Sequence, residues 1–250
     1  MHPATPPPLG TPPAPLTWFR TTPWTLIDQL AGDKAQRDGA LDSLLRIYWG
    51  AVYSYLRRQG HGPDDAAELA EGFFVHVVVS RELFDRADRA KGRLRSLMLT
   101  ALRNYLADVR RHEAPHTRRR ALGVDLHAEE RLVAEAGSTD PADAFDRRWA
   151  LAALEEAARR CEEHFLATDK AGHWAVFQAR VMGPAVRAAT APPLGPLCEA
   201  HGFASAAHGA AAVQTVKKRF EAILQEVVAQ TVRDEREAAA EFDDLLRVLG

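Results

Sequence analysis

The sequence predicts an all-α protein, and three observations support this fold class. Hydrophobic residues make up 46% of the 250 residues, with many alanines and leucines, and no run of alternating β-branched residues is long enough for a sheet. Apolar residues instead recur at helical spacing in several segments. Proline, glycine and capping residues stand at the ends of these segments, where helices begin and end. A chain of this length can form one or two compact domains.

The first residues differ in composition from the rest. Residues 1–17 contain seven prolines and no charged residue, which predicts a disordered, Pro-rich extension. Thr22 as a cap and Pro23 as the first helical residue then predict a helix that ends at Gly32. A longer helix follows and ends at Gly60. Its apolar face consists of Leu41, Leu44, Leu45, Tyr48, Val52 and Leu56.

The next segment begins at Pro63, which favours a first helical position. Asp64 and Asp65 complement the positive end of the helix dipole there. Residues 73–79 are rich in valine and phenylalanine and would also suit a strand. The acidic, alanine-rich start and the helical spacing nevertheless favour a helix.

Residues 92–112 form the most distinctive predicted helix. One face is apolar and consists of Leu94, Leu97, Met98, Ala101, Leu102, Tyr105, Leu106 and Val109. The other face is small, polar and basic. Residues 86–120 carry eleven Lys and Arg against three acids, a local charge of +8 in a chain of net charge −2. Such a basic segment on an acidic background is typical of a nucleic-acid contact, although a solvated basic face without a ligand produces the same pattern.

These helices predict a first domain over residues 18–112, a four-helix bundle. Residues 113–139, with an arginine triplet, Pro115 and Gly137, predict a basic linker. Asp140 as a cap before Pro141 opens a second domain over residues 140–232. Residues 233–250 are predicted to form an acidic tail that does not contact DNA.

The second domain ends in the pattern of a helix-turn-helix. A short helix at residues 197–201 is followed by a turn around Gly202 and a long amphipathic helix that starts near Ala206. Any pair of antiparallel helices produces the same outline. The buried side of the long helix is predicted to hold Val213, Val216, Phe220, Ile223, Leu224, Val227 and Thr231.

The sequence argues against an enzyme and predicts neither a cofactor nor a metal site. Residues 112–116 match HExxH, but Pro115 disrupts the helical turn on which zinc binding depends. No Gly-rich phosphate loop or nucleophile elbow is present. Cys161 and Cys198 form no CxxC pair, which suits a reducing cytoplasm. No stretch approaches the roughly 20 apolar residues of a membrane span.

Several separate segments, in the right order, resemble a bacterial RNA polymerase sigma factor, specifically the ECF-like group of the extracytoplasmic-function type. They are FRTTPWTLIDQLAGD, DDAAELAEGFFVHVV, KGRLRSLMLTALRNYLADVRR, DPADAFDRRWALAAL and VVAQTV. The resemblance implies a cytoplasmic, DNA-binding factor that binds core RNA polymerase through the β′ clamp helices and β flap. It also implies recognition and melting of the −10 element of promoter DNA by the basic helix. An anti-sigma regulator is a further partner that this family allows.

The resemblance also assigns candidate site residues. The polymerase-binding candidates are Asp64, Asp65, Glu68 and Glu71. The DNA-binding candidates are Arg93, Arg95, Arg103, Asn104, Arg110, Arg111, Arg118, Arg119, Arg120, Gln214, Lys217, Lys218 and Arg219.

Three positions depart from the family pattern. Glu71-Gly72 replaces a glutamine followed by an acid, and Val109 replaces an aromatic residue that would stack on a melted base. The would-be recognition helix begins SAAHGAAAVQ and has few side chains for reading base edges, so we expect weak recognition of a −35 element. These departures keep a second hypothesis open: a sigma-like helical adaptor that binds polymerase or another protein without promoter recognition.

Overall fold

The structure is a computed structural model that describes residues 33–79, 93–112, 125–135, 140–184, 190–232 and 235–249, together with Gln29. Every element in these ranges is helical, which confirms the all-α fold class. The helices are α2 (Lys34–Arg58), α3 (Pro63–Phe73), α5 (Leu94–His112), α6 (Leu126–Glu135), α7 (Pro141–Ala167), α8 (Ala171–Phe177), α10 (Leu194–Ala200), α11 (Ala206–Ala229) and α12 (Glu235–Leu249), with π-helical turns η1 (Phe74–Val79) and η2 (Gln178–Met182). The predicted extension over residues 1–17 and nearly all of the helix ending at Gly32 lie outside the described residues.

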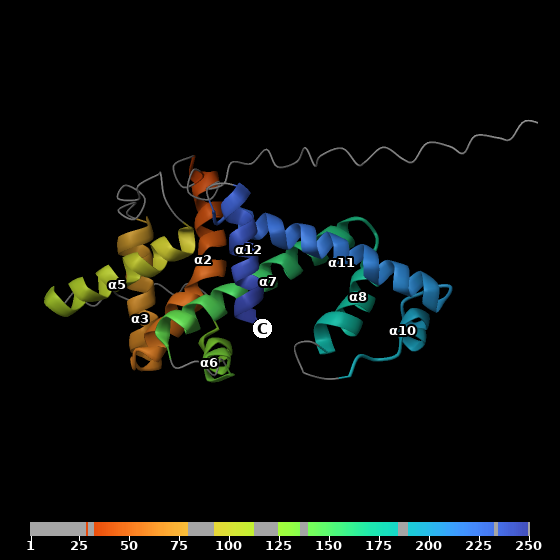
Figure 1. Cartoon of the computed structure of the whole chain (residues 1–250), viewed down its shortest axis with the longest axis horizontal. Helices are drawn as coiled ribbons and strands as arrows, with labels where there is room; N and C mark the ends of the chain where they lie inside the picture. Colours follow the sequence, from red (N-terminus) through yellow and green to blue (C-terminus); the bar gives the residue numbers. More distant parts are fainter. Residues whose placement is uncertain are drawn as a thin grey trace, which may run out of the picture.

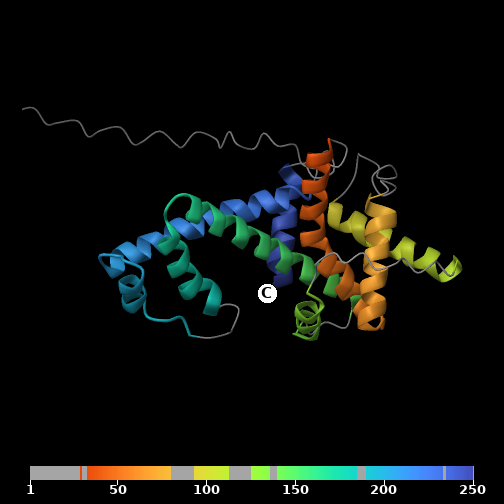
Figure 2. The same ribbon diagram turned by 180° about the vertical axis from the view of Figure 1, so that it is seen from behind.

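Helices α2 and α7 form the centre of the molecule (Figure 1). They make the most extensive contact between any two described elements. Tyr48 of α2 and Phe145 of α7 meet with ring centroids 6.5 Å apart, and both side chains are fully buried. Helices α3 and α5 lie at one end of this centre, and α8, α10 and the start of α11 lie at the other (Figures 1 and 2).

The helix boundaries follow the local signals in the sequence. Asp33 caps α2 by accepting a hydrogen bond from the Gln36 backbone at 2.9 Å. After α2, Gly60 adopts a φ of +94°, a conformation that glycine reaches without a steric cost. Pro63 begins α3 as predicted, and the helix continues through η1 to Val79. The valine-rich segment is therefore helical, as the acidic start of the helix indicated.

The predicted N-termini of α7 and α11 are confirmed in the same way. The Asp140 carboxylate accepts hydrogen bonds from the Ala142 and Asp143 backbones at 2.7 and 3.2 Å. Ser205 caps α11, and Gly202 in the preceding turn has a φ of +75°. The short helix, turn and long helix predicted for residues 197–231 are thus present as α10, the turn and α11.

The two-domain division is not confirmed. Phe145 and Trp149 of α7, from the expected second domain, are 0% exposed and belong to the same hydrophobic cluster as the residues of α2 and α3. The cluster continues into α11 through Val216 and Val227. One apolar core therefore joins the segments expected on either side of the linker.

Helix α6 lies within the segment expected to be a linker. Asp125 caps it by accepting hydrogen bonds from the His127 and Ala128 backbones. Glu129 then accepts two hydrogen bonds from the Arg148 guanidinium of α7, at 2.9 and 2.7 Å. A second acid, Glu130, accepts hydrogen bonds from Tyr53 and Arg57 of α2. These polar contacts and the buried Val133 hold the segment against the core.

The expected acidic tail contains α12. The helix is amphipathic, with Leu245 fully buried and Leu246 52% exposed. It packs on α7 and α11 (Figure 1). No helix in the described part of the chain is long and apolar enough to cross a membrane.

Candidate nucleic-acid interface

The basic helix α5 starts near the centre of the molecule and runs outward to one end (Figure 1). Its predicted apolar stripe is confirmed: Leu94, Met98, Leu102 and Leu106 are all buried. Tyr105 packs against Phe73 of α3, with ring centroids 5.9 Å apart. The apolar face thus anchors α5 and leaves the polar face of its outer half in solvent.

Four DNA-binding candidates lie on this outer half and are exposed: Arg103, Asn104, Arg110 and Arg111. Arg110 donates to the Gln59 side chain at 3.1 Å. Arg111 forms an ion pair with Asp108 at 2.8 Å, in which the two side chains are 68% and 62% exposed. Exposed pairs of this kind contribute about 0–1 kcal/mol, so a phosphate can displace them. We call these four residues the outer basic face.

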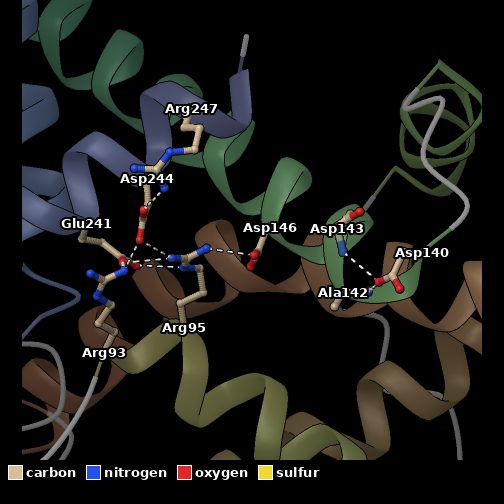
Figure 3. A network of polar contacts seen from close by, with 9 residues as sticks. All are labelled: Arg93, Arg95, Asp140, Ala142, Asp143, Asp146, Glu241, Asp244 and Arg247. Atoms are coloured by element: carbon tan, nitrogen blue, oxygen red, sulfur yellow. Dashed lines mark hydrogen bonds and ion pairs between the residues drawn. The ribbon is translucent and has the colours of Figure 1, made fainter.

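The two candidates at the start of α5 lie in a different environment. Figure 3 shows Arg93 and Arg95 directed at Glu241 and Asp244 of α12. Arg95 Nε donates to Glu241 at 2.9 Å and its Nη1 pairs with Asp146 of α7 at 3.0 Å. Arg93 pairs with Glu241 at 3.0 Å and also with Asp244. We call these five residues the α5–α12 network.

The interior of this network is charged and well shielded. The Arg95 guanidinium lies 4.8 Å from the centre of the Trp149 ring, and the Glu241 side chain is 0% exposed. Burial alone would lower the pKa of Arg95, but the hydrogen bonds and charges of Glu241 and Asp146 together outweigh it and raise that pKa. Arg95 therefore remains a cation, bound to carboxylates rather than available to a phosphate.

The two aspartates of the network respond oppositely to their surroundings. Burial raises the pKa of Asp146, and Arg95 offsets only part of that shift. For Asp244, burial also acts to raise the pKa, but hydrogen bonds from Arg93 and Arg247 lower it overall. Asp244 is thus the more firmly ionised partner of α5. Sequence reasoning missed these acids, although the acidic face of an amphipathic segment at residues 235–249 could have indicated a basic partner helix.

The α10–α11 pair supplies the second group of candidates, at the end of the molecule opposite the outer basic face (Figure 2). Gln214, Lys217 and Lys218 are exposed. Lys217 lies 3.8 Å from Glu221, one turn away on the same helix, and both side chains are more than half exposed. Arg219 is half-buried, and its charge acts on the Cys161 thiol inside the molecule. The structure therefore gathers three of these four candidates on the outer side of α11.

The predicted polymerase-binding acids lie along α3. Asp64 and Asp65 are exposed in its first turn, while Glu68 and Glu71 are half-buried. Burial raises the pKa of Tyr105 in α5, and the Glu68 charge raises it further. This acidic side of α3 therefore adjoins the inner side of α5.

The remaining sequence motifs are accounted for as far as the structure describes them. Arg118, Arg119 and Arg120 lie outside the described residues, as do the His112 side chain and the rest of HExxH. Among described residues, no group of three or more His, Cys, Asp or Glu is arranged to hold a metal ion. Burial raises the pKa of the Cys161 thiol to about 11, as expected of a structural thiol.

Known proteins offer no further guide to this site. Comparison of the chain with protein-family models, with curated proteins and with solved structures finds no match.

Proposed function

We propose that the chain is a cytoplasmic, sigma-like transcription initiation factor that binds core RNA polymerase and directs it to promoter DNA. In this proposal α5 contacts and melts the −10 element, α3 docks on the β′ clamp helices, and the α10–α11 pair lies toward the β flap and upstream DNA. The protein performs no catalysis of its own. An anti-sigma protein is a further partner that the proposal allows.

The observation that carries the proposal is the outer basic face. Arg103, Asn104, Arg110 and Arg111 are exposed on a helix whose other side is anchored in the core. Phosphate contacts need accessible cations, and this face supplies them. The exposed Lys217 and Lys218 at the other end of the molecule supply a second basic surface for the same duplex.

A second candidate function is a sigma-like adaptor that binds polymerase or another protein without promoter recognition. It is favoured by the α5–α12 network, which removes Arg93 and Arg95 from the basic surface. The alanine-rich start of α11, where Ala207, Ala210 and Ala211 are exposed, also favours it.

Purified protein mixed with core polymerase distinguishes the two. Co-elution with the polymerase, together with transcription from some promoter in a genomic fragment library, is the result expected of an initiation factor. Co-elution without transcription supports the adaptor instead. Absence of co-elution contradicts the initiation factor and an adaptor that binds polymerase, and it leaves an adaptor that binds another protein.

The outer basic face makes a quantitative prediction. Replacing Arg103, Arg110 and Arg111 together by alanine is expected to weaken promoter binding of the polymerase complex. The slope of log K against log[salt] should become shallower by about 0.7–0.9 for each DNA phosphate that the variant no longer neutralises. Filter binding or fluorescence anisotropy over a salt series measures that slope.

A matched control removes three exposed arginines from other helices: Arg37 of α2, Arg131 of α6 and Arg147 of α7. This variant changes the net charge by the same amount and should leave the slope unchanged. Equal slopes for both triple variants would show that the outer basic face does not touch DNA.

A further inference from the structure

The start of α5 is held by two kinds of contact that differ in origin. The Leu94 backbone N–H donates to the Thr231 carbonyl at 3.0 Å, and Asp146 of α7 pairs with Arg95 at 3.0 Å. Glu241 and Asp244, by contrast, approach Arg93 and Arg95 from α12 (Figure 3). Withdrawal of α12 would take away these two carboxylates, while the contacts with Thr231 and Asp146 do not depend on that helix.

Arg93 depends on α12 most directly. Its ion-pair partners within the described ranges, Glu241 and Asp244, both belong to that helix. Its side chain is already 28% exposed, whereas that of Arg95 is 10% exposed and lies against Trp149. If α12 moved away, Arg93 would become an accessible cation on the helix that bears the outer basic face.

Helix α12 buries less apolar surface than α7 does. Leu245 is fully buried, Phe242, Val248 and Leu249 are half-buried against the core, and Leu246 is exposed. Helix α7 instead buries Phe145, Trp149 and a long series of alanines. Peripheral helices with little buried apolar surface are the ones that open locally while the rest of a domain stays folded.

We propose that α12 is an intramolecular cover for the DNA-binding helix. Its carboxylates Glu241 and Asp244 occupy the guanidinium groups as DNA phosphates would, so promoter DNA and α12 compete for the start of α5. Binding of DNA displaces α12, and any change that weakens the α12 contacts strengthens DNA binding. This inference rests on the proposed function and adds a regulatory state to it.

The test compares two neighbouring aspartates of α12. Asp244→Asn removes a carboxylate that binds Arg93, and Asp243→Asn removes an exposed one outside the network, with the same change in net charge. In the complex with core polymerase, D244N should bind promoter DNA more tightly than D243N. Its log–log salt slope should match that of D243N, because α12 is displaced in both DNA complexes and the same cations then neutralise phosphates. D243N should match the wild type.

Arg93→Ala supplies the internal check. In the D244N background it should make the salt slope shallower by about 0.9, because Arg93 neutralises one phosphate once α12 is displaced. The otherwise unchanged chain should show the same change in slope, because bound DNA displaces α12 there too. Circular dichroism establishes that all variants retain the wild-type helix content.

Hydrogen exchange on the wild-type complex gives an independent readout that needs no variant. Amides of α12 should lose protection when promoter DNA binds, while those of α7 keep it. The inference is overturned if D244N and D243N bind DNA with equal affinity, or if α12 protection is unchanged by bound DNA. Failure of the proposed function would give a different result, in which neither the wild type nor any variant forms a promoter complex with polymerase. The inference about α12 would then be rejected together with the proposed function.

Discussion

Gly50→Ala is expected to lower the free energy of unfolding by about 3 kcal/mol, although alanine is normally the better helix former. A Cβ atom at residue 50 would lie 2.7 Å from Arg148 Nε and 2.8 Å from Glu129 Oε2. Neither group can move away easily, because both belong to the ion pair that fastens α6 to α7. Disrupting one partner of such a buried pair leaves an uncompensated charge, which costs about 3–5 kcal/mol.

Gly39→Ala is the matched control on the same helix. A Cβ there has no atom within 4 Å, and Gly39 is exposed. We expect this substitution to stabilise the protein by about 0.5–1 kcal/mol, the ordinary gain from replacing a helical glycine. Urea denaturation followed by circular dichroism measures both variants. Similar effects of the two substitutions would contradict the close packing of α2 against the Glu129–Arg148 pair.

The helices that the sequence predicted correctly are those with local signals. Pro63, Asp140 and Ser205 begin helices, Gly60 and Gly202 follow helix ends, and each signal acts within a few residues of its position. The apolar stripes between them then define the buried faces. Such information is written in neighbouring residues and needs no knowledge of tertiary contacts.

Helix α6 escapes prediction because its stability comes from distant partners. Glu130 binds Arg57, 73 positions earlier, at 2.6 Å, and also accepts a 2.5 Å hydrogen bond from Tyr53. The Arg57 hydrogen bonds lower the pKa of Glu130, which keeps its carboxylate ionised. Charged residues in a short amphipathic segment look like a solvated surface until their partners are known. The segment expected to be a linker is therefore helical over residues 126–135.

The candidate site shows the same difference between features that local sequence predicts and features that depend on distant residues. Exposure of Arg103 and Arg110 follows from the helical spacing, because the apolar stripe determines which side faces the core. The internal pairing of Arg95 does not follow from the helical spacing, since its partner Glu241 is 146 positions away. Charge counting treats all arginines of a segment alike. Only the packing of α12 separates the occupied cations from the accessible ones.

Gly209→Ala is expected to destabilise the α10–α11 pair by about 3 kcal/mol, the upper range for forcing extra atoms into a packed site. A Cβ at residue 209 would lie 2.1 Å from Cys198 Sγ, far inside contact distance. Cys198 is 2% exposed, so its thiol has little space to rotate away. The two helices meet at this point without room for a methyl group.

Cys198→Ala should relieve this clash, because the next atoms near the new Cβ are Leu194 Cδ1 at 3.6 Å and Cys198 Cβ at 3.7 Å, which are ordinary contacts. The C198A/G209A double variant should therefore be more stable than G209A alone, with a coupling energy of about 2 kcal/mol in a double-mutant cycle. Gly195→Ala on α10, where a Cβ has no atom within 4 Å, should not be destabilising. Additive effects of C198A and G209A would mean that the thiol is not the obstacle. Energetic coupling between the two substitutions would show that Gly209 and Cys198 together set the distance between α10 and α11, because their side chains meet where the two helices cross.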